Sequence, residues 1–101
     1  MVMRQAPRFT LPLDVKCRPV TDLSSQAFLG NVRNISVRGL YFLSAADQPI
    51  GARLNFIVTQ QTGQGRFLLK GTCTVVRCDD LSASHQEAGF GIAAKIEEVT
   101  P

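Results

Sequence analysis

Apolar side chains recur at every second position in three stretches of the chain, and a period of two is typical of half-buried β-strands. The longest stretch runs from Phe9 to Cys17, with mostly polar residues at the intervening positions. Pro12 places this predicted strand at a sheet edge or a bulge, because proline lacks an amide hydrogen. The alternation recurs from Leu54 to Val58 and from Phe90 to Ile96. These stretches predict three strands.

Three further segments have the composition of strands, with many β-branched and apolar residues. They are Ala27 to Val32, Gly39 to Leu43, and a longer run from Arg66 to Cys78 that follows a turn at Thr62 to Gly65 and so predicts a hairpin. Helical periods are few, and only Ala45 to Asp47 could form a helical turn. Six strands separated by turn residues predict an all-β fold, a small six-stranded antiparallel β-barrel.

The bulk properties of the sequence predict one folded domain. A chain of 101 residues, of which 45% are apolar, can bury a modest core but is too short for two domains. Lys and Arg outnumber Asp and Glu by 11 to 8, and eight of the cations are arginine. This excess is too small for wrapping a long polyanion, but a local arginine cluster can hold a small one.

The residues that could carry metal or catalytic chemistry are few and scattered. Cys17, Cys73 and Cys78 have no Cys-x-x-Cys spacing, and His85 is the only histidine. We therefore expect no metal site, no cofactor and no disulfide framework, but reduced and buried thiols. One histidine and scattered carboxylates give no recognisable set of acid, base and nucleophile, so the chain is not expected to be an enzyme.

The N-terminal segment shows no targeting signal. Met1 to Phe9 has no apolar run of signal-peptide length, and no part of the sequence approaches the roughly 20 apolar residues of a spanning helix. We therefore expect a cytoplasmic protein without membrane insertion. Residues 1–8 precede the first predicted strand, and a terminus that is not tied into a sheet is usually poorly ordered, so a flexible tail is expected there.

Two short polar patterns carry the candidate chemistry. The first, Arg4-Gln-Ala-Pro-Arg8, offers two guanidinium groups, which bind phosphate in a two-pronged way and stack on or hydrogen-bond purine bases. The second, Asn34-Ile-Ser-Val-Arg-Gly39, has residues that favour turns, so it is expected to connect two strands. Side chains two apart in extended backbone point to the same side, and glycine leaves room for a flat base. Together the patterns predict capture of a nucleotide.

The order and placement of these two patterns resemble the PilZ domain. In that family, Arg-x-x-x-Arg precedes the first strand, and Asn-x-Ser-x-x-Gly precedes a strand like the Gly-Leu-Tyr-Phe stretch of this chain. The likeness runs through the whole sequence, including Gly51 and the Gly89-Phe-Gly-Ile stretch. It implies a single domain over residues 1–101, with a flexible ligand-binding tail at 1–8 and a β-barrel of PilZ type at 9–98.

The resemblance also implies a function, that of a bacterial receptor for the second messenger cyclic di-GMP. Carried over by position, Arg4 and Arg8 would grip the guanines and phosphates from the tail. The residues that would meet the ligand from the barrel wall are Asn34, Ser36 and Gly39. In such domains the tail commonly reorders on binding and signals to a partner, so a downstream protein effector is also expected.

Four residues near the two patterns allow more than one interpretation. Gln5 follows Arg4 where many family members have a second basic residue, which would weaken affinity for the ligand. Arg33 and Arg38 could compensate as auxiliary ligand contacts, although such residues are more often simple exposed charges. Tyr41 could stack on a base, but within its strand it is expected to be half-buried barrel packing.

Two alternative functions stay open at this point. A PilZ-like fold could be a nucleotide-independent protein-interaction module of pilus, flagellar or polysaccharide machinery. A small basic barrel could also bind single-stranded nucleic acid, but such grooves combine a basic track with several exposed aromatic side chains. This chain has one Tyr, no Trp and six Phe that mostly fall at core-like positions, so neither DNA nor RNA is expected as a partner.

Overall fold

The computed structural model describes residues 13–22, 26–60, 67–81 and 89–100, and these form six β-strands. The strands are β1 (Leu13–Pro19), β2 (Phe28–Ile35), β3 (Gly39–Ser44), β4 (Arg53–Gln60), β5 (Phe67–Asp80) and β6 (Phe90–Thr100). The all-β prediction is therefore confirmed. Ala45 and Ala46 form a bend rather than part of a helical turn.

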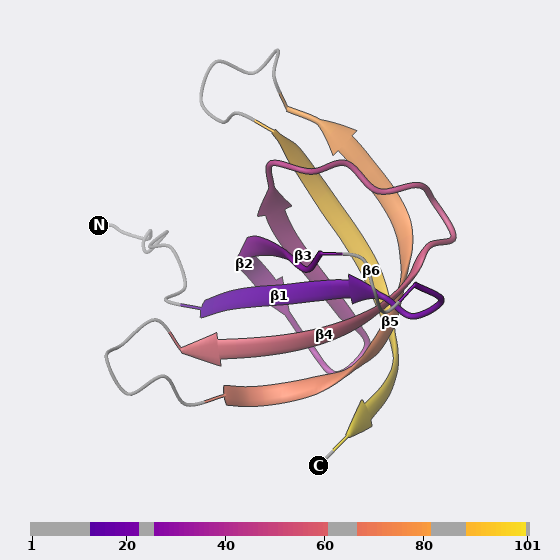
Figure 1. Ribbon diagram of the computed structural model, residues 1–101. Coiled ribbons are helices and arrows are strands. Elements are labelled where there is room, and N and C mark those ends of the chain that lie inside the picture. Colours follow the sequence, from indigo (N-terminus) through magenta and orange to yellow (C-terminus); the bar gives the residue numbers. More distant parts are fainter. Residues whose placement is uncertain (1–12, 23–25, 61–66, 82–88, 101) are drawn as a thin grey trace, which may run out of the picture.

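The strands close into an antiparallel barrel in the order β1-β2-β3-β6-β5-β4 (Figure 1). Closure depends on pairings between strands that are far apart in the sequence. β1 pairs with β4 over seven registered positions, and β6 lies between β3 and β5. With this strand order, the wall formed by β3 and β6 lies opposite the wall formed by β1 and β4. The closed barrel confirms the predicted architecture.

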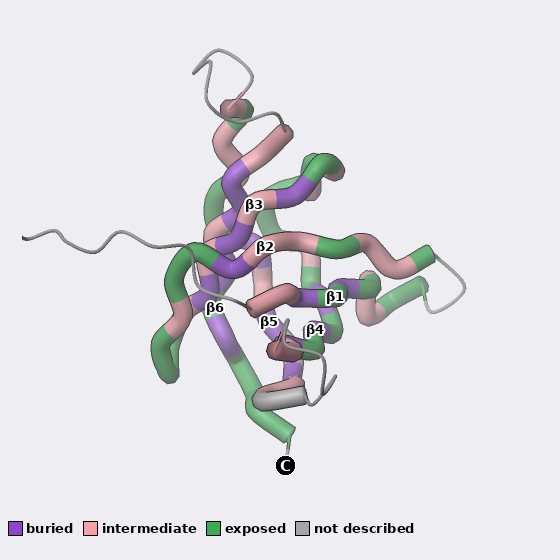
Figure 2. Tube along the Cα trace, turned by 90° about the vertical axis from the view of Figure 1, so that its left-hand side faces the viewer, coloured by how far each residue is buried: buried purple, intermediate pink, exposed green. Residues whose placement is uncertain are grey.

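The interior of the barrel is filled by the side chains that alternate along the strands. β4 shows the pattern most simply, because Leu54, Phe56 and Val58 are buried while the residues between them are exposed. In Figure 2 the buried residues follow the middle of the strands, and the C-terminal end of β6 is exposed. Burial of one large apolar side chain stabilises a fold by about 1.5 to 3 kcal/mol, so this core is the main stabilising element. Its members are Val15, Cys17, Val32, Leu40, Phe42, Leu54, Phe56, Val58, Cys73, Val75, Ile92, Ala94 and Ile96.

Several strands are longer than expected from the sequence, and two of these differences affect the predicted domain plan. β2 continues to Ile35, so Asn34 belongs to a strand and only residues 36–38 connect β2 to β3. The expectation that the connection starts at Asn34 is therefore wrong. β6 continues to Thr100, two residues beyond the expected end of the barrel. The predicted elements that lie outside the described residues are the tail at 1–8, the strand residues 9–12 and the turn at 62–65.

A β-bulge explains why Asn34 belongs to a strand and yet faces outward. Val32 pairs with Phe42 and Asn34 pairs with Tyr41, so Arg33 is an extra residue on β2. In a regular strand, side chains two apart share a face, and Asn34 would follow Val32 into the core. The extra residue of a bulge reverses this alternation. Asn34 is accordingly exposed, whereas Val32 is fully buried.

The three cysteines are free thiols, and two of them are buried as expected from the sequence. Cys17 and Cys73 are buried in the core, and Cys78 is half-buried. Burial, with the neighbouring Cys73, raises the pKa of the Cys17 thiol well above its usual range. Burial, with the nearby carboxylate of Glu97, raises the pKa of Cys73 to about 12. Because the thiolate is the reactive form, both core thiols are protected from oxidants and alkylating agents.

This protection predicts how the thiols respond to reagent and to pH. At pH 8, Ellman's reagent is expected to modify Cys78 in the folded protein, and Cys17 and Cys73 only after unfolding. Since the folded pKa values lie above the unfolded value of 9.0, the stability from the neutral core thiols is complete below pH 9 and declines as the pH rises toward 12. The decline is about 1.4 kcal/mol per pH unit for each thiol, measured by urea unfolding.

The matched control for the pH experiment is the double variant Cys17→Val with Cys73→Val. It removes the two titrating groups and keeps the apolar volume close to that of the native core. Its free energy of unfolding should fall less steeply above pH 9 than that of the unchanged protein. Equal slopes, or rapid modification of all three thiols in the folded protein, would contradict the burial of this pair.

Candidate functional site

One row of outward-facing residues crosses four adjacent strands of the barrel. Asn34 on β2 pairs with Tyr41 on β3. Tyr41 pairs in turn with Ala93 on β6, and Ala93 pairs with Arg77 on β5. Residues that are directly opposite in neighbouring strands have Cβ atoms about 5 Å apart, so the four side chains are held as one continuous row. Strand register, and not a loop, fixes their relative positions.

A second β-bulge brings Arg77 into this row. Val75 pairs with Ala94, and the next registered pair is Arg77 with Ala93, so Val76 is the extra residue. Without the bulge, Arg77 would share the inward face of Val75, which is fully buried. Both polar ends of the row, Asn34 on β2 and Arg77 on β5, are therefore presented outward by irregularities in their strands.

The row forms part of a groove with a volume of about 380 Å³. Small-molecule sites commonly have volumes of about 300 to 1,000 Å³, so the groove has the size for a ligand. Polar groups lie at its two ends, and the small residues Gly39 and Ala93 lie between them. The residues that line the groove are Asn34, Ser36, Gly39, Leu40, Tyr41, Arg77, Ala93 and Ala94.

Ser36 organises the turn between β2 and β3 and still offers a hydrogen bond to the groove. Its amide donates to the carbonyl of Gly39 over 2.9 Å, and its Oγ accepts from the amides of Arg38 and Gly39, each over 3.3 Å. A hydroxyl has two acceptor lone pairs and one donor hydrogen. The two amides occupy the lone pairs, so the O–H is left to donate to a ligand oxygen or nitrogen.

The fold of the ligand-free chain does not require glycine at position 39. Gly39 lies in a strand, its φ is not in the left-handed region, and a Cβ built there would come no closer than 3.5 Å to the carbonyl oxygen of Ala94. A separation of that size is ordinary van der Waals contact. The missing side chain instead keeps the middle of the groove flat, which suits the close approach of a planar ring.

Tyr41 lines the groove as well as packing on the barrel. It is half-buried, as expected from the sequence, and its ring lies over Gly91 of β6, where an added Cβ would come within 2.8 Å of the ring carbon Cζ. The close fit over glycine holds the phenol against the sheet. Besides this packing, Tyr41 belongs to the lining of the groove and gives it an aromatic surface.

Arg77 supplies positive charge at the far end of the groove. Its Nε donates to Oδ2 of Asp79 over 3.0 Å, and both side chains are largely exposed to solvent. An exposed ion pair contributes only about 0 to 1 kcal/mol, so a ligand phosphate can compete for the guanidinium at little cost. Lys95 is exposed on β6 directly opposite Gly39, and adds a second cation beside the groove.

The structure brings together only some of the residues singled out by the sequence. Asn34, Ser36 and Gly39 line one groove, whereas Arg33 and Arg38 do not line it. Arg33 is the extra residue of the β2 bulge, and the carbonyl of Arg38 accepts from the amide of Ile96. Arg4 and Arg8 lie outside the described residues.

Arg77 and Ala93 also line the groove, but no local sequence pattern indicates either residue. Their place depends on pairings between β5, β6 and β3 and on a bulge. An arginine within a strand is compatible with any exposed position, so only the barrel register could have indicated Arg77. Within the described ranges, no group of three or more His, Cys, Asp or Glu could hold a metal ion. In the same part of the chain, no helix is long and apolar enough to span a membrane.

A closed all-β barrel with a polar groove on its outer wall defines a small ligand-binding module. A scan of protein families finds the PilZ domain over residues 3–100, and the chain therefore belongs to the PilZ domain family. PilZ domains are receptors for cyclic di-GMP in second-messenger signalling, and they act as binding or adaptor modules rather than as enzymes. A comparison with curated proteins gives no match, and neither does a comparison with solved structures.

Proposed function

We propose that this chain is a bacterial cytoplasmic receptor that binds cyclic di-GMP in the groove that runs from β2 across β3 and β6 to β5. The observation that carries the proposal is that Asn34, Ser36 and Gly39 line one groove. Cyclic di-GMP is a ring with two phosphodiester groups and two guanines. It therefore requires donors for its phosphate oxygens, polar partners for the guanine edges and flat surfaces for the guanine faces. The groove offers all three.

Each side chain of the groove has a distinct part in this proposal. The hydroxyl of Ser36 donates to a phosphate oxygen or to an acceptor on guanine, because its lone pairs are already used. The amide of Asn34 both donates and accepts, which matches the mixed edge of guanine. Arg77 turns from Asp79 to a phosphate or to a guanine, and Tyr41 gives a base an aromatic surface to contact.

The two tail arginines complete the proposed site from the other side of the ligand. β1 begins at the end of β2 that carries Asn34, because Asp14 pairs with Asn31 in an antiparallel register. At about 3.3 to 3.6 Å per residue, Arg8 can lie at most about 18 Å from the start of β1. The segment ahead of β1 is therefore long enough for Arg4 and Arg8 to reach a ligand in the groove.

Closure of the tail over the ligand would convert binding into a signal. Ordering a chain segment costs about 1 to 2 kcal/mol per residue, and each charge-assisted hydrogen bond returns about 1.5 to 3 kcal/mol. Several such bonds are needed before the tail closes, and a ligand with two phosphates and two guanines can make them. The ordered tail then presents a changed surface to a downstream protein effector.

Calorimetric titration with cyclic di-GMP tests the proposal. The unchanged protein is expected to give saturable heat at micromolar concentration. Arg8→Ala should weaken binding by about tenfold or more, the loss of one or two charge-assisted hydrogen bonds, and leave the melting temperature nearly unchanged. The matched control is Arg18→Ala, which removes an exposed arginine from the opposite wall of the barrel and should bind like the unchanged protein.

Two outcomes would count against a cyclic di-GMP receptor. The first is the absence of saturable heat from protein that melts cooperatively, which would favour the nucleotide-independent interaction module instead. The second is equal weakening by Arg8→Ala and Arg18→Ala, since this would point to non-specific attraction of an anion by net positive charge.

A further inference from the structure

The wall opposite the groove carries a second face of different chemistry. Leu29 on β2 pairs with Lys16 on β1, and Lys16 also pairs with Ile57 on β4, so the three residues form one row on the outside of the barrel. Leu29 is 65% exposed and Ile57 is 39% exposed. Two large apolar side chains thus flank a lysine on a sheet surface. Neither apolar residue contributes to the core.

A hollow of about 240 Å³ lies beside this row. Lys16 and Arg18 alternate outward along β1 between buried neighbours, and both are exposed. Within the part of the chain that the structure describes, neither cation has an ion-pair partner. Among the described residues, the hollow therefore combines two cations with an apolar margin. The residues that line it are Lys16, Cys17, Arg18, Ala27, Asn55 and Ile57.

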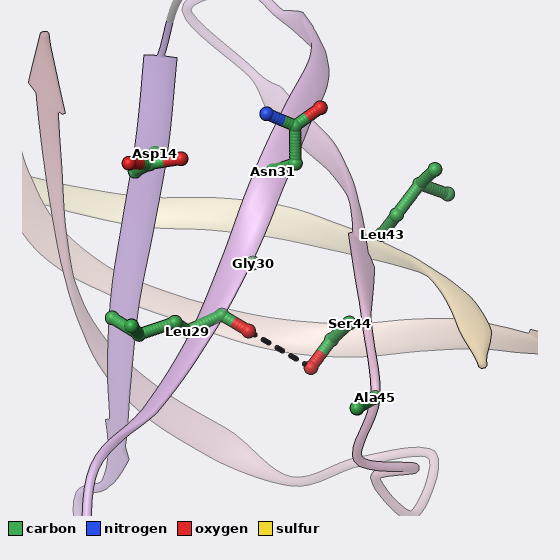
Figure 3. Close-up of a pocket in the computed structure, with 7 residues that line it drawn as sticks. All are labelled: Asp14, Leu29, Gly30, Asn31, Leu43, Ser44 and Ala45. Atoms are coloured by element: carbon green, nitrogen blue, oxygen red, sulfur yellow. Dashed lines mark hydrogen bonds between the residues drawn. The ribbon is translucent and has the colours of Figure 1, made fainter. Parts of the chain in front are cut away.

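A second hollow of about 300 Å³ continues the face toward β3 (Figure 3). Leu29 belongs to its lining, Leu43 adds a further apolar side chain on β3, and Asp14 on β1 places one carboxylate at its margin, away from Arg18. The strands are fixed at this point by a hydrogen bond from the hydroxyl of Ser44 to the carbonyl of Leu29, over 3.1 Å. The row is thus held on paired strands, with one hollow beside Ile57 and the other beside Leu29.

We propose that this face, defined by Lys16, Arg18, Leu29, Ile57 and the two hollows, docks an acidic segment of a protein partner. Carboxylates of the segment pair with Lys16 and Arg18, and its apolar side chains pack on Leu29 and Ile57. Charge complementarity selects this occupant, since Lys16 and Arg18 are exposed on one strand beside the first hollow and attract carboxylates. The inference goes beyond cyclic di-GMP binding, because the face shares no lining residue with the groove and needs no nucleotide.

Other occupants fit the face less well. A second copy of the chain, docked through the same face, would bring Lys16 and Arg18 of both copies together, and like charges repel. An anionic membrane is recognised by larger clusters of basic residues, usually four to eight. A single strand of nucleic acid needs aromatic side chains on which its bases can stack. Leu29 and Ile57 cannot supply such a surface.

The experiment is a titration of isotope-labelled protein without nucleotide, followed by amide shifts in NMR spectra. The probe is a synthetic nine-residue peptide of alternating Glu and Leu. It is expected to shift the amides of β1, β2 and β4 in a saturable way and to leave those of β6 unchanged. The double variant Lys16→Glu with Arg18→Glu should weaken binding at least tenfold, and Leu29→Ser at least threefold. Arg77→Ala, on the opposite wall, should bind like the unchanged protein.

The controls separate this proposal from its alternatives. A peptide with Lys in place of Glu should produce no shifts on β1, and vesicles containing phosphatidylserine should not retain the protein on flotation. Equal binding of both peptides, shifts confined to other strands, the absence of any shift, retention by the vesicles, or dimerisation that Lys16→Glu abolishes would each overturn it. Failure of the cyclic di-GMP titration would leave these expected shifts unaltered.

Discussion

Replacing Gly39 by valine is expected to abolish measurable binding of cyclic di-GMP while the barrel stays folded. The side chain would project from the middle of the groove, between Ser36 and the wall formed by β6, and would occupy the space proposed for a planar base. Loss of that close approach should weaken binding by about 100-fold or more, which corresponds to about 2.7 kcal/mol. Calorimetric titration measures this directly.

The same substitution should hardly affect stability. Space for a Cβ exists at Gly39, and valine is favoured in strands, so the melting temperature should stay within about 3 °C of the original. Gly39→Ala serves as the graded control, because a single methyl group should weaken binding less than the branched side chain does. Retention of full affinity by Gly39→Val would show that the ligand does not lie against this wall.

Replacing Gly71 by alanine is expected to have the opposite effect and to destabilise the whole barrel. Gly71 is buried on β5, where the backbone of β6 comes unusually close. An added Cβ would overlap the carbonyl oxygen of Glu98, and it would lie 2.9 Å from the carbonyl carbon of Glu98 and 3.0 Å from the Cα of Val99. Backbone atoms cannot move aside like the end of a side chain, so β5 and β6 would have to separate.

The expected cost of Gly71→Ala is about 3 kcal/mol or more, at the upper end of the range for overpacked cores. For a domain of this size, such a loss lowers the melting temperature by about 15 °C. Thermal unfolding followed by circular dichroism gives the value, and Gly39→Ala is the matched control, a glycine to alanine change in the same barrel. If the two variants melted at the same temperature, the close approach of β5 and β6 would be refuted.

Much of the barrel could be predicted from sequence, because period-two alternation arises directly from burial of one face of each strand. β4 and β6 illustrate this, since their inward residues are the apolar ones that alternate in the chain. The direction in which side chains point could not be predicted from the sequence where this alternation breaks. The bulges at Arg33 and Val76 add one residue to a strand, and no local residue type specifies such an insertion.

The candidate site was predictable in part, and the division has a physical basis. Asn34, Ser36 and Gly39 are close in the chain, so a short pattern could indicate them and turn geometry brings them together. Arg77 is far away in the sequence, and its place beside the groove depends on the register of three strand pairs. Pairing between strands that are distant in the sequence produces no short sequence pattern. The row of Lys16, Leu29 and Ile57 could not be predicted from the sequence for the same reason.

The position of β6 between β3 and β5 has a consequence for biosynthesis. This strand is translated after the other five, and until it exists the sheet is open on one side. Ala93 and Lys95, which belong to the groove wall and its margin, also arrive with it. A chain still emerging from the ribosome therefore has neither a sealed core nor the complete groove, and only polypeptides whose sixth strand has been added carry the whole proposed site.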